Sequence, residues 1–377
     1  MEGDFIKIND WLLPLSWIYG AGVRLRNQMF EMGMLKSRSF DIPVISVGNI
    51  TVGGSGKTPH VEYLINLLRD KVKVAVLSRG YKRKSKGYML ATADTPMSDI
   101  GDEPYQMKKK FADIYVAVDK DRCHGIDQLT TNEETSDTDV ILLDDAYQHR
   151  YVKPGVNILL VDYHRLIMYD KLLPAGRLRE PQKGKARADI VIVSKCPADL
   201  KPMEFRVITK AMNLFPYQKL YFTTLKYGSL RPIYGGEDRK LDTLTGDTSI
   251  LLLTGIASPQ QMIVDLKPYT ERITPLTFPD HHQYTDADID RINAEFEAMK
   301  GNDKMIVTTE KDNARLCGME GLSDEVKKNI YVLPVEVGFM LDQEEDFNEN
   351  IIGYVRKNSR NSILAKRKDD NKSENSN

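Results

Sequence analysis

The sequence predicts an α/β protein in which helices cover both faces of a parallel sheet. Apolar strand-like runs alternate with helical patterns through the first half of the chain, the order that builds parallel sheets. A glycine-rich loop at 51–58 follows the first apolar run and precedes a helical pattern. The length of 377 residues is too great for one typical core and natural for two domains.

The first domain is expected over 41–215. Its expected strands are short apolar runs at 42–47, 72–77, 114–118, 140–143, 156–161 and 190–193. Its expected helices lie at 59–69, 103–111, 121–129 and 203–214. This alternation predicts the parallel sheet with helices on each side.

The pattern changes near residue 216. Residues 219–227 are rich in β-branched and aromatic side chains, and extended pieces over 216–236 are expected to form a ribbon between the domains. A second α/β domain is expected over 237–360, with strands at 250–253, 304–308 and 330–335 and helices at 259–266 and 286–299. The tail at 361–377 has almost no apolar content and is expected to be disordered.

The composition narrows the class of protein. Hydrophobic residues are 41% and charged residues 28%, as in soluble globular proteins, and a net charge of -1 gives no field that attracts nucleic acid. Cys123, Cys196 and Cys317 are widely spaced without a C-x-x-C pattern, which fits a reducing cytosol and argues against disulfides or a zinc site. Neither a cleavable signal peptide nor an apolar run of roughly 20 residues is visible.

The segment 1–40 contains both tryptophans of the chain. Trp11 and Trp17 stand in an apolar stretch that is followed by Arg24 and Arg26. Tryptophan beside arginine suits a segment that lies in a bilayer interface. The alternative is an N-terminal helix that packs on the core, and the segment alone does not choose between the two.

The loop at 51–58 has the features of a phosphate-binding loop. It consists of Thr51, Val52, Gly53, Gly54, Ser55, Gly56, Lys57 and Thr58. Its glycines let backbone N–H groups face phosphate oxygens, and the following helix adds its positive end. Lys57 can reach the β- and γ-phosphates, and the Thr58 hydroxyl can ligate Mg²⁺. Thr51 replaces the usual first glycine, so the alternative is a glycine-rich turn that binds nothing.

Two pairs of carboxylates stand next to predicted elements. Asp144 and Asp145 end an apolar strand, where phosphate-loop enzymes hold Mg²⁺, and the spacing does not choose between them. Asp102 and Glu103 precede a predicted helix, where capping by Asp102 is the simpler interpretation. The functional interpretation is a carboxylate that accepts a proton from a substrate hydroxyl.

Other polar segments are less specific. His281 and His282 form a pair that is more often structural, although a histidine of the second domain can orient or assist a base. The basic loops at 78–84 and 172–181 suit phosphate recognition or are solvated turns. The role of 308–312 does not follow from its spacing.

Together these segments resemble the tetraacyldisaccharide 4'-kinase family, the lipid A 4'-kinases of Gram-negative bacteria. The resemblance rests on blocks at 47–59, 77–81, 101–104, 144–149, 172–181, 254–257, 278–284 and 308–312, which occur in the family's order. It implies two α/β/α sandwich domains joined by a β ribbon, the first with a P-loop NTPase-like parallel sheet. It also implies transfer of phosphate from ATP, with Mg²⁺, to the 4'-hydroxyl of tetraacyldisaccharide 1-phosphate, which gives lipid IVA.

The resemblance also assigns roles to residues. The loop lysine and hydroxyl fall on Lys57 and Thr58, the metal-binding pair on Asp144 and Asp145, and the catalytic pair on Asp102 and His281. Glu103, Gln148, Arg179 and Glu180 are assigned to substrate binding. Thr51 belongs to the family's version of the loop, and Ala146 stands where the family usually has glycine.

The same resemblance predicts partners and location. The family's N-terminal segment contacts the inner membrane, which favours the interfacial interpretation of 1–40. The expected partners are the lipid A precursor and a membrane surface, with no nucleic acid, at the cytoplasmic face of the inner membrane.

Two other functions share these motifs. A phosphate-loop regulatory NTPase often carries a lysine before the first loop glycine, where this chain has Val52, and a GTPase needs Asn-Lys-x-Asp, which 194–197 lacks. Another small-molecule kinase or ligase on the same fold is the second alternative.

Overall fold

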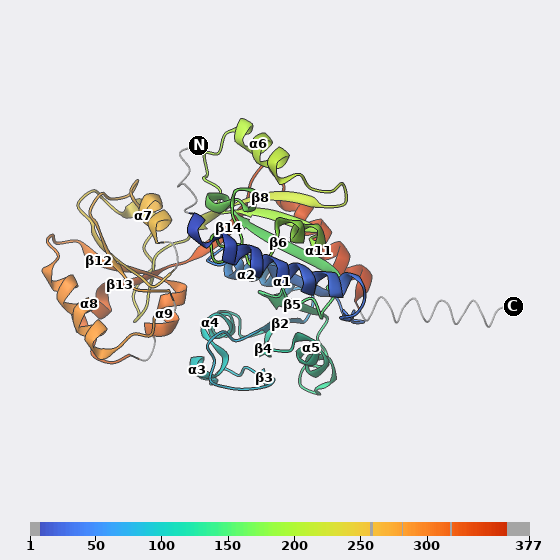
Figure 1. The fold of residues 1–377 in the computed structure, drawn as a ribbon. Coiled ribbons are helices and arrows are strands. Elements are labelled where there is room, and N and C mark those ends of the chain that lie inside the picture. The colour runs from blue at the N-terminus through green and yellow to red at the C-terminus, as the bar shows by residue number, and fades with distance from the viewer. Residues whose placement is uncertain (1–7, 257–258, 281, 317–318, 360–377) are drawn as a thin grey trace. The chain divides into compact units, whose positions relative to one another are not determined.

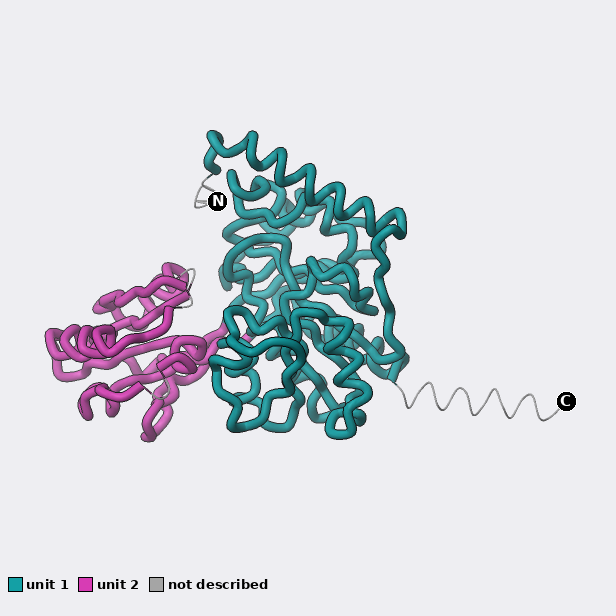
Figure 2. Tube along the Cα trace, turned by 60° about the horizontal axis from the view of Figure 1, so that its bottom comes forward, with its two compact units in different colours: residues 1–225, 337–377 teal, residues 226–336 magenta. Residues whose placement is uncertain are grey.

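The computed structural model describes residues 8–256, 259–280, 282–316 and 319–359. The chain forms two compact units, one of Met1–Leu225 with Val337–Asn377 and the other of Lys226–Glu336 (Figure 2). The predictions for His281 and for the tail at 361–377 lie outside the described residues.

The first unit is built on a nine-stranded sheet (Figure 1). Its strands are β1 (Val44–Gly48), β2 (Val74–Ser78), β3 (Met89–Leu90), β4 (Tyr115–Val118), β5 (Val140–Asp144), β6 (Val156–Asp162), β7 (Ile190–Ser194), β8 (Lys219–Tyr227) and β14 (Val335–Phe339). Their order is β14-β8-β7-β6-β1-β5-β2-β4-β3. The ladder from β8 to β4 is parallel, and β3 pairs with β4 antiparallel.

Helices cover both faces of this sheet. They are α1 (Leu13–Glu31), α2 (Lys57–Leu68), α3 (Met97–Ile100), α4 (Asp102–Lys110), α5 (Arg122–Thr131), α6 (Pro202–Met212) and α11 (Glu344–Asn358). On one face α2, α4 and α11 pack against a core that includes Ile45 and Val76. On the other face α5 and α6 bury Ile126 and Ile208 against the strands. Burial on both sides explains why each central strand is a continuous apolar run.

The second unit repeats this plan on a smaller scale. Its five-stranded sheet has the order β11-β10-β12-β13-β9. The strands are β9 (Arg231–Pro232), β10 (Ser249–Thr254), β11 (Ile273–Thr277), β12 (Lys304–Thr309) and β13 (Ile330–Leu333), and the helices are α7 (Gln260–Leu266), α8 (Asp286–Ala298), α9 (Glu310–Leu316) and α10 (Asp324–Asn329). α7 packs on one face, and α8, α9 and α10 pack on the other. The predicted fold class, two α/β/α sandwich domains with mainly parallel sheets, is confirmed.

The limits of the units differ from the predicted domain limits. The second unit ends at Glu336, whereas the sequence led us to expect 360. The remaining helix α11 returns to the first unit because Phe347, Ile351 and Val355 form an apolar stripe that is buried in its core.

The connection between the units also differs from the prediction of a ribbon within 216–236. β8 is a strand of the nine-stranded sheet, and its neighbour β14 comes from the far end of the second unit. The Met340 N–H donates to Phe222 O at 2.9 Å, and the Gly228 N–H donates to Pro334 O at 3.0 Å. The chain therefore leaves and re-enters the first unit along two adjacent strands.

Helix α1 has one packed side and one apolar exposed side. The packed side carries Ser16, whose hydroxyl donates to Leu172 O at 3.0 Å. The exposed side carries Trp17 and Ile18, which are 66% and 71% exposed. Within the part of the chain that the structure describes, no helix has both the length and the apolar character needed to cross a membrane.

Candidate active site

The loop between β1 and α2 is held on both sides by backbone contacts. On one side, the Val52 N–H donates to Arg177 O at 2.8 Å, and Thr51 forms an isolated antiparallel bridge with Leu178. On the other side, the Ser194 hydroxyl donates to Ser55 O at 2.9 Å. The loop is thus shaped by the protein itself, as a preorganised binding site requires.

Two loop glycines adopt backbone conformations that suit glycine. Gly53 has φ +118° and Gly56 has φ +77°, both in the left-handed region. Gly56 is the N-cap of α2, and no side chain caps this helix start. The first N–H groups of the helix therefore stay available to an anion. Thr51 is not among the positive-φ residues, which explains why the loop tolerates threonine where many such loops have glycine.

The two strand-end aspartates occupy different environments. Asp144 is 1% exposed, and its Oδ2 accepts a hydrogen bond from the Ser78 hydroxyl at 3.1 Å. Asp145 has φ +47° and turns toward the loop, where its Oδ1 lies 3.7 Å from Lys57 Nζ and its Oδ2 lies 3.3 Å from Arg179 Nη1. The carboxylate that contacts the loop lysine is therefore that of Asp145.

The charges at this edge of the sheet affect the two carboxyls in opposite directions. Burial, followed by the charges of Glu103 and Asp145, raises the pKa of Asp144 to about 7. Burial also acts to raise the pKa of Asp145, but the charges of Lys57 and Arg179 outweigh it and the pKa is lowered. The Asp145 carboxyl is thus held as an anion beside Lys57. The Asp144 carboxyl loses its proton more readily when a cation binds next to it.

These oxygens suit a hard cation such as Mg²⁺. Oδ1 of Asp144 and Oδ1 of Asp145 are shielded from solvent and form no hydrogen bond within the described chain. Mg²⁺ prefers carboxylate and hydroxyl oxygens. Asp144, Asp145 and the Thr58 hydroxyl, next to Lys57 at the start of α2, are the residues that fit this ion.

Asp102 and Glu103 open helix α4 at the same edge. Two glycine turns fix this helix start, because a Cβ on Gly101 would lie 2.9 Å from Tyr81 O and one on Gly80 would lie 2.8 Å from Ile100 O. Asp102 is 9% exposed. The N-cap of α4 is Gly101, without a side-chain capping bond, so the capping interpretation of Asp102 was wrong.

Gln148, Arg179 and Glu180 form a network behind the loop. The Gln148 amide donates to Asn49 O and to Glu180 Oε1, the latter at 3.2 Å. Arg179 Nη1 donates to Gln148 Oε1 at 3.4 Å as well as to Asp145. Glu180 is 3% exposed and accepts two bonds of 2.9 Å from Arg187. These contacts support the loop and Asp145, and they place Glu180 in the interior.

The histidine block lies in the second unit. Within the described residues, His282 Nε2 lies 2.9 Å from Asp288 Oδ2, and the ring of His282 stacks on Phe278 with centroids 4.8 Å apart. His282 therefore has a structural role. The prediction for its neighbour His281 stays a prediction, because His281 is outside the described residues.

Three further residues at this site were not predicted from the sequence. Lys195 follows β7, donates to Gly54 O and reaches Asp162 Oδ2 at 2.8 Å. The buried His60 lies 2.7 Å from Gly56 O through Nδ1. Arg122 is 3% exposed; burial lowers its pKa to about 10, although Asp144 and Asp145 act to raise it. Lys195 and Arg122 each follow a strand end, a signal that could have identified them.

Comparisons with known proteins agree over nearly the whole chain. The profile of the family described as Tetraacyldisaccharide-1-P 4'-kinase matches residues 8–356. Relatives named tetraacyldisaccharide 4'-kinase include proteins of Phocaeicola vulgatus, 61% identical over 97% of this chain and 100% of that protein, and of Bacteroides fragilis, 55% identical over 99% and 100%. The relative of that name in Flavobacterium johnsoniae is 43% identical over 92% of this chain and 97% of its own.

A solved structure is similar over the same extent. It is LpxK from Aquifex aeolicus in complex with ATP, which has a TM-score of 0.68 and 31% identity and covers 91% of this chain and 98% of its own. The match extends through both units and both sheets. The chain therefore belongs to the tetraacyldisaccharide-1-P 4'-kinase family.

Proposed function

We propose that this protein transfers the γ-phosphate of ATP to the 4'-hydroxyl of tetraacyldisaccharide 1-phosphate and so forms lipid IVA. The observation that carries the proposal is the ion pair between Lys57 Nζ and Asp145 Oδ1, 3.7 Å apart, at the start of the helix that follows the glycine loop. It joins the cation that neutralises phosphate charge to the carboxylate that suits Mg²⁺, in a member of a kinase family.

The chain's own residues perform three tasks in this scheme. The loop N–H groups and Lys57 hold the phosphates and offset their charge, since phosphoryl transfer depends on positioning and electrostatics. Asp145 and Asp144, with Thr58, would hold the metal, and Mg²⁺ when bound would neutralise charge on the phosphate oxygens. Arg179 and Gln148 keep Asp145 and the loop in register.

The acceptor side of the proposal rests on Asp102. Its carboxylate accepts the proton of the sugar hydroxyl as the sugar oxygen attacks the γ-phosphorus. The new P–O bond forms while the bond from the γ-phosphorus to the β–γ bridging oxygen breaks and ADP leaves. The position of Asp102 at the start of α4 fits a fixed base, because two glycine turns hold that start. His281 is proposed as its partner, and Glu103 as a contact to substrate, from the family resemblance.

The proposal extends to a membrane surface. Helix α1 and the residues next to it expose large apolar side chains, which are Trp11 just before the helix, Leu15, Trp17, Ile18 and Leu25 within it and Met32 just after it, with exposures from 53% to 93%. Such a surface suits the boundary between head groups and acyl chains, where a lipid substrate resides. Tyr19 of the same helix donates to Arg179 O at 2.7 Å and so connects it to the network at Asp145. We place the protein at the cytoplasmic face of the inner membrane.

The test is transfer of radiolabel from ATP to tetraacyldisaccharide 1-phosphate in detergent micelles with Mg²⁺. Labelled lipid that is lost in Lys57→Ala supports the kinase. Hydrolysis of ATP that is slow and independent of the acceptor indicates a regulatory NTPase, and transfer only to another acceptor indicates a different kinase. Co-sedimentation with vesicles of anionic lipid, reduced in Trp11→Ser with Trp17→Ser, tests the membrane surface.

A further inference from the structure

A second group of ligand-type side chains lies in the first unit, away from the loop at 51–58. It consists of Asp121, Cys123 and His149, whose ligand atoms lie within 4.8 Å of one another. Asp121 is exposed, whereas Cys123 and His149 are half-buried. The wide spacing of the cysteines argued against a zinc site, but spacing among cysteines does not detect a site with one thiolate, one imidazole and one carboxylate.

The fold brings these residues together from two strand ends. Asp121 and Cys123 begin α5 after β4, and His149 lies in the loop after β5, on the same edge of the sheet. Backbone bonds hold both pieces, since the Cys123 thiol donates to Tyr151 O at 3.5 Å and the His149 N–H donates to Ala146 O at 2.8 Å. The three positions are therefore part of the folded framework.

Each side chain keeps an atom available for a ligand bond. One carboxylate oxygen of Asp121, Oδ1, accepts from the Cys123 N–H at 2.9 Å as the helix cap, and Oδ2 is not used in that cap. The Cys123 sulfur acts as a donor in its bond to Tyr151. His149 Nε2 is shielded from solvent and has no hydrogen-bond partner in the described chain. A buried polar atom without a partner calls for an explanation, and a bound ion is one that also accounts for the neighbouring thiol and carboxylate.

The electrostatic surroundings favour a neutral imidazole. Burial, followed by the charge of Arg122, lowers the pKa of His149 to about 4. The nearby cation Arg122 is itself bonded through Nη1 to the carbonyls of Asp119 and Lys120. A thiolate and a carboxylate would balance the two charges of a divalent ion, and the positive charge of Arg122 would remain beside the site.

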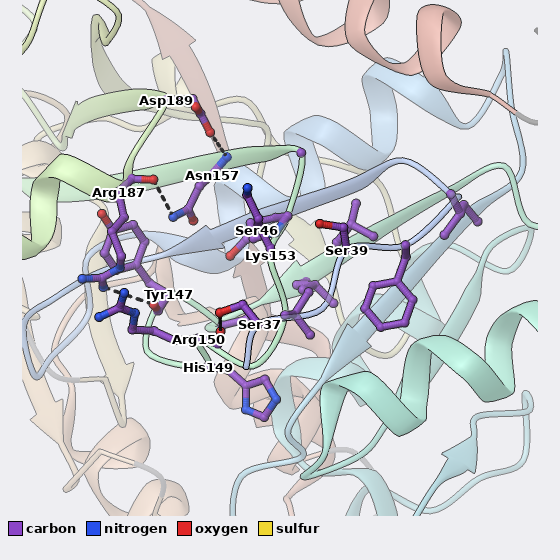
Figure 3. A pocket seen from close by; sticks show the side chains of 18 of the residues that line it. Ser37, Ser39, Ser46, Tyr147, His149, Arg150, Lys153, Asn157, Arg187 and Asp189 are labelled. Atoms are coloured by element: carbon purple, nitrogen blue, oxygen red, sulfur yellow. Dashed lines mark hydrogen bonds between the residues drawn. The ribbon is translucent and has the colours of Figure 1, made fainter. Parts of the chain in front are cut away.

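One of the three residues faces a cavity. His149 lines a cavity of about 610 Å³ that extends to Asn157 and Asp189, whereas Asp121 and Cys123 are not among its lining residues. Figure 3 shows His149 at the end of this cavity that is remote from Asp189. An ion bound by three protein ligands would keep its fourth position open.

We propose that Asp121, Cys123 and His149 bind one divalent ion of the zinc class, with sulfur, nitrogen and oxygen ligands and an open fourth position. This ligand set selects Zn²⁺ or Co²⁺ over Mg²⁺, which takes oxygen ligands. His149 adjoins Gln148, which holds the loop carbonyl of Asn49, so the ion would tie the phosphate loop to the start of α5.

The experiment is a Co²⁺ titration of the full-length, chelator-treated protein in excess Mg²⁺. Mg²⁺ occupies oxygen sites at Thr58 and Asp145, and only a thiolate ligand gives a sulfur-to-cobalt charge-transfer band. We expect this band to saturate at one Co²⁺ per chain and to disappear when Zn²⁺ is added.

The variants decide between this site and any other thiol. Cys123→Ser, which preserves the side-chain shape, removes the band, and His149→Ala weakens Co²⁺ binding at least about tenfold, as loss of a ligand does. Cys317→Ser is the matched control and keeps the band. Absence of the band in the unaltered protein, or a band that survives Cys123→Ser, would overturn the proposal. Unchanged circular dichroism of each variant shows that it folds.

Discussion

Buried aspartates lie at the carboxyl ends of the strands in both parallel sheets, but they differ in whether their carboxylate oxygens have partners. In the first unit, Asp144 and Asp145 each keep a buried oxygen that has no hydrogen bond within the described chain. In the second unit, Asp312 and Arg315 have no exposed side-chain surface and pair at 3.1 Å.

The pair in the second unit is closed by the backbone around it. Asp312 Oδ2 accepts from the Gly255 N–H at 2.9 Å and from the Thr309 hydroxyl at 2.7 Å, and Arg315 donates to Gly255 O at 3.0 Å. The same sheet edge thus supports a binding site where polar atoms stay available, and a structural clasp where they satisfy one another.

The largest effect that tests this comparison is expected in Asp102→Ala. Loss of a general base lowers turnover by about 10²–10⁴-fold. ATP binding stays intact, since the loop and Lys57 are unchanged. Rates of transfer to the lipid acceptor and equilibrium binding of ATP measure the two separately.

Asp102→Asn is the control for folding, because it keeps the size of the side chain. It should lose turnover as Asp102→Ala does. Intact turnover in either variant would show that Asp102 is not the general base.

The clasp predicts the reverse pattern in Asp312→Ala. The buried charge of Arg315 would then lose the carboxylate that pairs with it, and loss of one member of a buried ion pair destabilises a protein by about 3–5 kcal/mol. Turnover per folded molecule should stay unchanged. Urea unfolding gives the stability, and activity normalised to the folded fraction gives the turnover.

Asp247→Ala provides the matched control in the same unit. The Arg272–Asp247 pair spans 3.0 Å, but Asp247 is 87% exposed, so its loss should not change stability measurably. If the Asp312→Ala protein is stable but has reduced turnover, the Asp312–Arg315 pair serves function rather than stability, and the proposed difference between the two sheet edges is wrong.

Local sequence was enough to predict the site at the carboxyl edge of the first sheet. The glycine-rich loop and Lys57 are adjacent in the chain, and Asp144 and Asp145 come at the end of a predicted strand. Local sequence could not decide between Asp144 and Asp145, since that depends on which carboxylate the backbone turns toward Lys57. The hydrogen bond from Gly255 to Asp312 joins a residue just after β10 to a residue of α9, and it has no local signal.

Long-range packing hid other features in the same way. α11 follows the second unit in sequence, but its stripe of Phe347 and Val355 is complementary to the core of the first. The approach of His149 to Cys123 likewise depends on the register of β4 and β5, which lie on either side of β2. Periodicity predicts an element and its apolar face, and it does not predict which core that face joins.

Acid should weaken the functional edge through His60. Burial lowers the pKa of His60 to about 4, against roughly 6.5 in an unfolded chain. Above the higher value the ring is neutral in both states and adds no pH dependence. Between the two values the unfolded chain binds a proton that the folded chain does not, so stability falls with falling pH, by about 2 kcal/mol near pH 5.

Urea unfolding of the unaltered protein and of His60→Gln near pH 8 and pH 5 measures this term. The acid-induced loss should be smaller in the variant by about the same 2 kcal/mol. An equal loss in both proteins would show that the ring contributes no acid sensitivity.

The smallest effect concerns Thr51, the residue at which the loop departs from the common pattern. Thr51 is 6% exposed and pairs with Leu178, without a left-handed backbone. Thr51→Gly should therefore destabilise the protein by about 0.5–1 kcal/mol through backbone entropy, and it should not improve ATP affinity. Gly53→Ala is the contrasting variant, because φ +118° strains any residue with a Cβ and should weaken ATP binding more. Tighter ATP binding by Thr51→Gly would mean that the loop at 51–58 is incompletely formed. The first sheet edge would then differ from the Asp312–Arg315 clasp in how well it is ordered, and not in its available polar atoms.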